Sequence, residues 1–148
     1  MSRYLVVAHE TVTNPQLLDQ VRSVSREDPQ AEFVLLVPAT PVRHLVFRRR
    51  SDEEPHVVAR RLAEKAKAMF TKKGINLVDT RVGPESPVEA IDQEVSAHPD
   101  YAGFVISTLP KETSRWLRMN LPRTVETKHG RPVYHVQAPL DWSAGDLP

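Results

Sequence analysis

The sequence predicts an α/β fold, namely an open five-stranded parallel sheet in the order 3-2-1-4-5 with helices on both faces. Three short runs, 4–8, 32–37 and 103–107, are almost wholly apolar, as parallel strands are when helices cover both sides of the sheet. Two further runs, 76–82 and 132–137, alternate apolar and polar residues, which is typical of edge strands. Helical patterns separate all five, so a strand-helix unit repeats four times before the last strand closes the sheet.

The first three helices have recognisable ends. The first begins at Asn14, a typical N-cap followed by Pro15, and the second is the longest and ends at Gly74, a left-handed C-terminal cap. The third begins with a capping box, Ser86 to Glu89. The side chains expected to face the core are Leu17, Leu18, Val21 and Val24 in the first helix, Val58, Leu62, Ala66, Met69 and Phe70 in the second, and Val88, Ile91 and Val95 in the third.

The fourth helical segment is expected in two parts, because Pro122 would interrupt the hydrogen bonding of one continuous helix. Asn120 is the expected N-cap of the second part. These elements fill one domain, residues 1–137. Residues 138–148 have no periodicity and are predicted to form a C-terminal tail, in which Leu140 and Trp142 are apolar enough to dock on a neighbouring subunit.

Composition excludes several classes of protein. The chain has 148 residues, no cysteine and a formal net charge of +1. Disulfides, Cys-ligated zinc and thiol catalysis are therefore excluded, and a general attraction to nucleic acid or anionic membrane is not indicated. No apolar run approaches the ~20 residues of a membrane span, and the first ten residues lack the features of a signal peptide. We expect a soluble, cytoplasmic protein.

The predicted strand order places a ligand site. The order reverses between strands one and four, and ligands of such sheets bind at the carboxyl ends of the strands that flank the reversal. The loops concerned are 9–11 and 107–110, the second of which leads into a helix rich in hydroxyl and arginine side chains. The candidate ligand-binding residues are His9, Glu10, Thr11, Ser107, Thr108, Thr113, Ser114, Arg115, Arg118 and Asn120.

Hydroxyls and arginines at the start of a helix favour a small anion or a phosphorylated molecule as the ligand. The alternative is purely structural: Thr113 is an ordinary N-cap, Trp116 and Leu117 belong to the core, and Arg115 and Arg118 are solvated.

Catalysis and metal binding have little support in the sequence. His9 and Glu10 are of types used in acid–base chemistry, and His44 and His56 would add metal ligands. However, no HxxxH or HExxH spacing is present and these residues come from separate segments, so neither a catalytic residue nor a metal is predicted.

Basic residues occur in two groups. The run 43–50 resembles a small nucleic-acid-binding patch, but in a chain of near-zero net charge a solvated loop is the favoured interpretation. A third interpretation is that this loop folds over an anionic ligand. The other group is expected to form the solvated face of the second helix, and comprises Arg60, Arg61, Lys65, Lys67, Lys72 and Lys73.

From Arg3 to Gln137 the order and spacing of these elements resemble the universal stress protein family. The motifs that carry the resemblance are "AEFVLLV", "TRVGPESPVEAI", "SRWL" and "HGRPVYHV". The resemblance implies a Rossmann-like fold of the adenine nucleotide alpha-hydrolase-like type. It also implies a cytoplasmic stress-response protein that forms a homodimer through the fifth strand.

The chain departs from the motif of the family's nucleotide-binding branch. That branch carries G-x2-G-x9-G-[ST] after strand four and an Asp after strand one. Here "STLPKET" replaces the first two glycines, Met119 and Asn120 replace the Gly-Ser pair, and His9 replaces the Asp. Without these glycines the backbone amides cannot approach a phosphate in the same way.

Three functions therefore stay open. The first is a non-catalytic binding or regulatory domain with a small anionic or phosphorylated ligand, or none. The second is an ATP- or AMP-binding stress protein whose Ser and Thr hydroxyls replace the glycine amides, with at most slow hydrolysis. The third is an α/β enzyme with His9 or Glu10 as its catalyst, which lacks a supporting motif.

Overall fold

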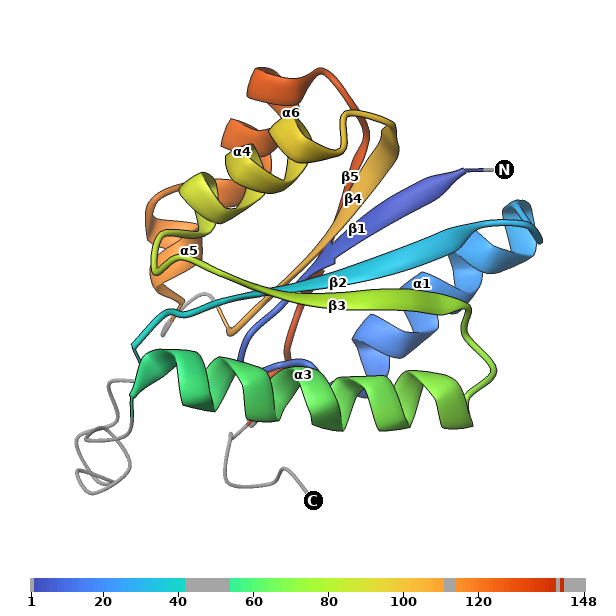
Figure 1. The fold of residues 1–148 in the computed structure, drawn as a ribbon, viewed down its shortest axis with the longest axis horizontal. Coiled ribbons are helices and arrows are strands. Elements are labelled where there is room, and N and C mark those ends of the chain that lie inside the picture. The colour runs from blue at the N-terminus through green and yellow to red at the C-terminus, as the bar shows by residue number, and fades with distance from the viewer. Residues whose placement is uncertain (1, 42–53, 111–113, 141, 143–148) are drawn as a thin grey trace.

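The structure is a computed structural model that describes residues 2–41, 54–110, 114–140 and 142. Its sheet has the order β3-β2-β1-β4-β5, and all neighbouring strands are parallel. The predicted fold class, the strand order and the two edge strands are therefore confirmed (Figure 1). The strands are β1 (Arg3–Val7), β2 (Glu32–Pro38), β3 (Leu77–Gly83), β4 (Tyr101–Thr108) and β5 (Val133–Gln137).

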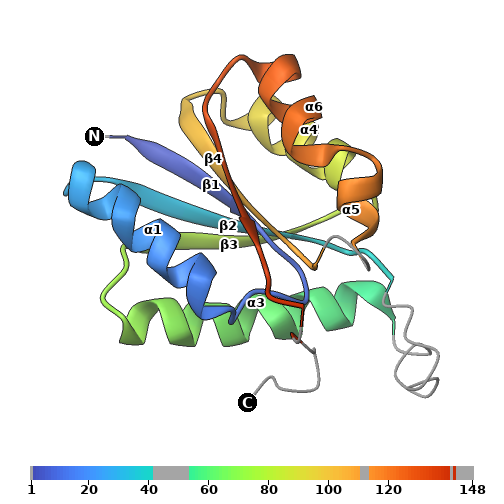
Figure 2. The same cartoon turned by 180° about the vertical axis from the view of Figure 1, so that it is seen from behind.

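Helices cover both faces of the sheet. The helices α1 (Pro15–Glu27) and α3 (Pro55–Lys72) lie on one face, and α4 (Pro87–Ala97), α5 (Arg115–Arg118) and α6 (Leu121–His129) lie on the other (Figures 1 and 2). Because Pro122 falls in the first turn of α6, the expected break of the fourth helical segment into two parts is confirmed.

Each face of the sheet has its own apolar core. In the central strands Val6 and Val105 pack toward α1 and α3, whereas Leu5 and Ile106 pack toward α4, α5 and α6. Since successive side chains of a strand point to opposite faces, a strand buried on both sides must be apolar at every position. This burial explains the unbroken apolar runs in the sequence.

The helix ends largely follow the local signals. Asn14 and Ser86 accept hydrogen bonds from the backbone N–H of Gln16 and Glu89, as N-caps do. Gly74 has φ +76°, and the N–H of the following residue, Ile75, donates to the carbonyl of Phe70. This is the Schellman arrangement, whose 6→1 hydrogen bond closes the end of the helix.

Asn120 corrects one prediction. It occupies the N-cap position of α6, but its side chain makes no capping hydrogen bond. Instead its backbone is left-handed, with φ 56° and ψ 45°. Asparagine tolerates this conformation better than most residues, so Asn120 serves the turn between α5 and α6 through its backbone rather than through its side chain.

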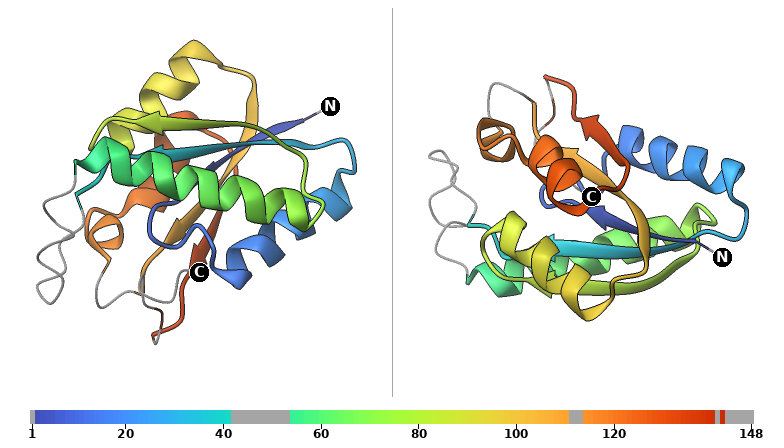
Figure 3. Two further views of the ribbon diagram at one scale, coloured as in Figure 1. Left: turned by 60° about the horizontal axis from the view of Figure 1, so that its bottom comes forward. Right: turned by 90° about the horizontal axis from the view of Figure 1, so that it is seen from above.

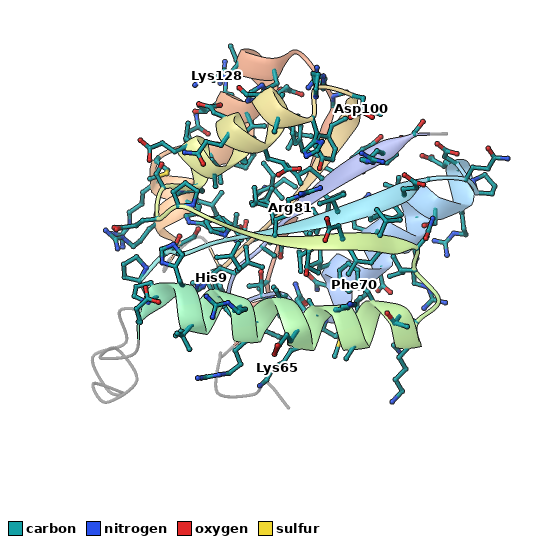
Figure 4. All side chains as sticks on the ribbon, viewed as in Figure 1. His9, Lys65, Phe70, Arg81, Asp100 and Lys128 are labelled. Atoms are coloured by element: carbon teal, nitrogen blue, oxygen red, sulfur yellow. The ribbon has the colours of Figure 1, made fainter. Side chains whose placement is uncertain are left out.

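A buried polar group joins β3 to α4 and β4. Glu94 is only 8% exposed; its carboxylate accepts a hydrogen bond from the Tyr101 hydroxyl at 2.6 Å and lies 3.0 Å from Arg81 Nε. Burial and the Glu94 carboxylate raise the pKa of Tyr101. Figure 4 shows Arg81 on the α4 side of the sheet. The negative charge of Glu94 is therefore balanced by the guanidinium group of Arg81.

Some expectations fall on residues that the structure does not describe. The basic run 43–50 and most of the predicted tail, residues 141 and 143–148, lie outside the described ranges. Among the helices that are described, none is both long and apolar enough to span a bilayer.

Candidate functional site

The candidate site lies where the carboxyl ends of β1 and β4 meet. These strands are neighbours, with Val7 opposite Ile106, so the chain that follows each strand emerges at the same edge of the sheet. There the hydroxyls of Thr11 and Ser107, 96 residues apart in sequence, are 2.6 Å apart and both side chains are buried. The segment that follows β1 therefore meets the end of β4 at this edge of the sheet.

The segment between β1 and α1 is held by two successive backbone turns. The N–H of Val12 donates to the carbonyl of His9, and the N–H of Asn14 donates to the carbonyl of Thr11. Asn14 then caps α1 through its side-chain oxygen. The backbone thus fixes three polar side chains, His9, Thr11 and Asn14, at the end of β1.

Two buried polar atoms of this segment have no hydrogen-bond partner among the described residues. They are His9 Nε2 and Asn14 Nδ2, on side chains that are 6% and 1% exposed. Most buried polar atoms in folded proteins are hydrogen-bonded, so two such atoms within six residues are unusual.

His9 is uncharged at neutral pH. Its burial lowers the pKa of the imidazole to about 4. A neutral imidazole has one N–H donor and one acceptor nitrogen. Its Nε2 can therefore donate or accept one hydrogen bond, but it supplies no positive charge to a ligand.

The other hydroxyls predicted for the site have partners within the protein. Thr108 Oγ1 lies 2.9 Å from His135 Nε2 on β5, and burial lowers the pKa of His135. Ser114 is the N-cap of α5 and accepts from the N–H of Leu117. Thr113, the cap expected by the structural alternative, lies outside the described residues. With Ser107 bonded to Thr11, every described hydroxyl of the predicted set is already engaged.

The exposed residues of the predicted set lie on and after α5. Arg115, Arg118 and Asn120 are exposed, whereas Trp116 is buried in the core. Since α5 has only four residues, few peptide dipoles align at its start. Any attraction of α5 for an anion therefore depends mainly on its arginines.

The described residues contain no group of three or more potential metal ligands. Glu10 is half-buried beside His9, while His56 is exposed at the start of α3 and pairs with Glu54 at 3.0 Å. His44 lies outside the described ranges. The structure thus does not bring His9 and His56 together in a metal-binding cluster.

Two contributions to the site were not predicted. The sequence indicates Asn14 as a helix cap, but not that its amide nitrogen would be buried with no partner among the residues that the structure describes. The contact of His135 with Thr108 depends on the register of β4 and β5, in which Thr108 is opposite Gln137. No local pattern in the sequence gives that register.

Comparisons with known proteins identify the fold. No protein-family model matches the sequence, and a comparison with curated proteins also finds no match. Solved structures do match. A universal stress protein from Archaeoglobus fulgidus is 17% identical, with a TM-score of 0.59 over 92% of this chain and 93% of that one.

Two further matches contain a nucleotide. A universal stress protein family protein from Arabidopsis thaliana with AMP bound is 12% identical, with a TM-score of 0.62 over 95% of this chain and 94% of that one. A universal stress protein in complex with cAMP is also 12% identical, with a TM-score of 0.62 over 93% of this chain and 98% of that one. At these identities the comparisons establish the shared fold.

Proposed function

We propose that this chain, which has the fold of the universal stress proteins, is a divergent member of that group and a non-catalytic binding or regulatory domain. It holds a small phosphorylated ligand at the carboxyl ends of β1 and β4. The observation that carries the proposal is the pair of buried atoms His9 Nε2 and Asn14 Nδ2, which have no hydrogen-bond partner within the described ranges. Each such atom costs about 1–3 kcal/mol when its hydrogen bond is missing, and a ligand that supplies the bond recovers that free energy.

The charges of the site suggest how a ligand is oriented. The buried part of the site carries no charge at neutral pH. Thr11, Asn14 and Ser107 are uncharged side chains, and the lowered pKa of His9 keeps its imidazole neutral. The neutral, hydrogen-bonding part of the ligand then lies against them. The anionic part lies toward the exposed guanidinium groups of α5. AMP combines both features and is bound by a protein of the same fold, so it is the first ligand to test.

The protonation state of His9 argues against catalysis. A general base works best when its pKa lies near the operating pH, and the pKa of His9 is about 4. No orienting partner for its Nε2 exists among the described residues. The hydroxyls proposed to replace the glycine amides are engaged with Thr11, His135 and Leu117, which counts against the ATP-hydrolysing alternative.

The binding prediction is tested by calorimetry and thermal shift with AMP, ATP and inorganic phosphate. We expect AMP to stabilise the wild-type protein. His9→Leu should weaken AMP binding about tenfold, because one buried hydrogen bond is worth about 1–2 kcal/mol. Arg115→Gln should weaken it severalfold, whereas Arg123→Gln, an equal charge change at an exposed position of α6, should leave it unchanged.

Other results would contradict the proposal in separate ways. If neither AMP nor phosphate binds the wild-type protein, the ligand class is wrong. AMP binding that is insensitive to His9→Leu places the ligand elsewhere. Release of phosphate from ATP, lost in the same variant, overturns the non-catalytic assignment.

We also propose that the protein forms a homodimer through β5. This strand pairs with β4 on one side only and forms one edge of the sheet, and an open edge can pair with a second chain. Light scattering should give a dimeric mass for the wild type. His135→Asp, which places carboxylates on both copies of this edge, should give a monomer, whereas Val78→Asp on the opposite edge strand should stay dimeric. A monomeric wild type excludes the interface.

A further inference from the structure

The solvent-exposed surface of α3, together with the residue that follows the helix, carries an excess of positive charge. Six cationic side chains occupy the region 60–73, and Glu64 is its only acid, so the excess is five positive charges on a chain whose formal net charge is +1. At 1.5 Å per residue these charges extend over about 20 Å of helix. All are exposed except Lys65, which is half-buried: Arg60, Arg61, Lys65, Lys67, Lys72 and Lys73.

Two acidic side chains of α4, on the opposite side of the sheet, do have partners of opposite charge. On α4, Asp92 pairs with Lys128 and Glu94 pairs with Arg81. On α3, by contrast, Arg60, Lys67, Lys72 and Lys73 form no ion pair with any residue that the structure describes. The near-neutral total therefore conceals four cations in this region that have no acidic partner among the described residues.

The composition of this face determines which polyanion suits it. Phe70, the aromatic residue of α3, is fully buried, and the exposed apolar side chains of α3 are Val57 and Ala68. Protein interfaces depend on buried aromatic and apolar anchors, and a helix on a membrane surface needs apolar side chains to insert. This face offers neither. Contacts to nucleic-acid phosphates need only cations at suitable spacing.

We propose that the outward face of α3 binds the phosphate backbone of a nucleic-acid duplex. In the left view of Figure 3, α3 crosses the front of the molecule as one straight, open helix. Because contacts from lysine and arginine to phosphate carry no sequence information, binding is expected to be independent of base sequence. The proposal does not depend on the ligand site at β1 and β4.

The test is fluorescence anisotropy with a labelled DNA duplex of arbitrary sequence, titrated over a range of salt concentrations. For four or five phosphate contacts, log K should fall with log salt at a slope of about −4. Replacing Lys67 and Lys72 by Gln should make the slope shallower by about 2 and weaken binding at low salt at least tenfold. Replacing Arg22 and Arg123 by Gln lowers the net charge equally, outside α3, and should change neither quantity.

Three outcomes overturn the proposal. The first is the absence of binding to the duplex at low salt. The second is an equal loss of affinity in the two double variants, which would attribute binding to net charge. The third is equal or tighter binding to polyglutamate or to anionic vesicles at the same salt, which would assign the face to a protein or to a membrane. Circular dichroism of both double variants controls for folding.

Discussion

Between pH 7 and pH 5 the protein is expected to lose about 2 kcal/mol of its free energy of unfolding through His9, and about 3 kcal/mol by pH 4. The pKa of His9 is about 4 in the folded protein, below its ordinary value of 6.5, because the imidazole is buried. Below pH 6.5 the unfolded chain therefore binds a proton that the folded protein does not. The contribution of His9 to the free energy of unfolding is complete above pH 6.5 and is lost as the pH falls toward 4.

Urea unfolding of wild type and His9→Leu at several pH values between 7 and 4 measures this effect. Carboxylates and the other histidines contribute equally to both proteins, so the difference between the two pH profiles isolates His9. His135→Gln is the control, since His135 is much less buried than His9 and its pKa is lowered without a comparably large shift, so the difference should be much smaller. Parallel profiles for wild type and His9→Leu would show that His9 is not buried in its neutral form.

Replacing Gly83 by valine is expected to destabilise the protein by about 2–3 kcal/mol, because the new side chain overpacks a close contact between β3 and α4. A Cβ at Gly83 would lie 2.7 Å from the Cβ of Ala90 and 3.2 Å from Cδ1 of Leu36. Carbon atoms in contact are normally about 3.5–4.0 Å apart. Since the Ala90 Cβ cannot rotate away, the strand and the helix must separate.

A double-mutant cycle identifies the cause. Ala90→Gly alone should cost about 1 kcal/mol through helix propensity, yet in the Gly83→Val background it should recover stability by removing the nearest atom. Gly83→Ala should fall between wild type and Gly83→Val. Equal effects of Gly83→Val with and without Ala90→Gly would show that the loss arises elsewhere, for example in the backbone of β3.

The sequence alone determined the architecture, because the signals that encode it are local. Unbroken apolar runs distinguish strands buried on both faces from alternating edge strands, and the observed order β3-β2-β1-β4-β5 fits that distinction. Asn14, Gly74 and Ser86 act at helix ends through bonds to residues a few positions away. The location of the candidate site follows from the same strand order.

The tertiary structure decided what the side chains do at these places. Thr11 meets Ser107 and Thr108 meets His135 across separate strands, so the hydroxyls that suggested a phosphate site are occupied by one another and by the protein. Burial leaves His9 Nε2 and Asn14 Nδ2 without partners in the part of the chain that the structure describes, and no sequence pattern reports an atom that lacks a partner.

Charge balance was likewise settled only in three dimensions. The acids of α4 find Lys128 and Arg81 on neighbouring elements, and most of the cations of α3 find no counterpart among the described residues. Hydrogen bonds and ion pairs between distant segments depend on register, helix orientation and packing. Residue type and spacing along the chain determine secondary structure, whereas the contacts that govern the site arise only when the strands and helices assemble.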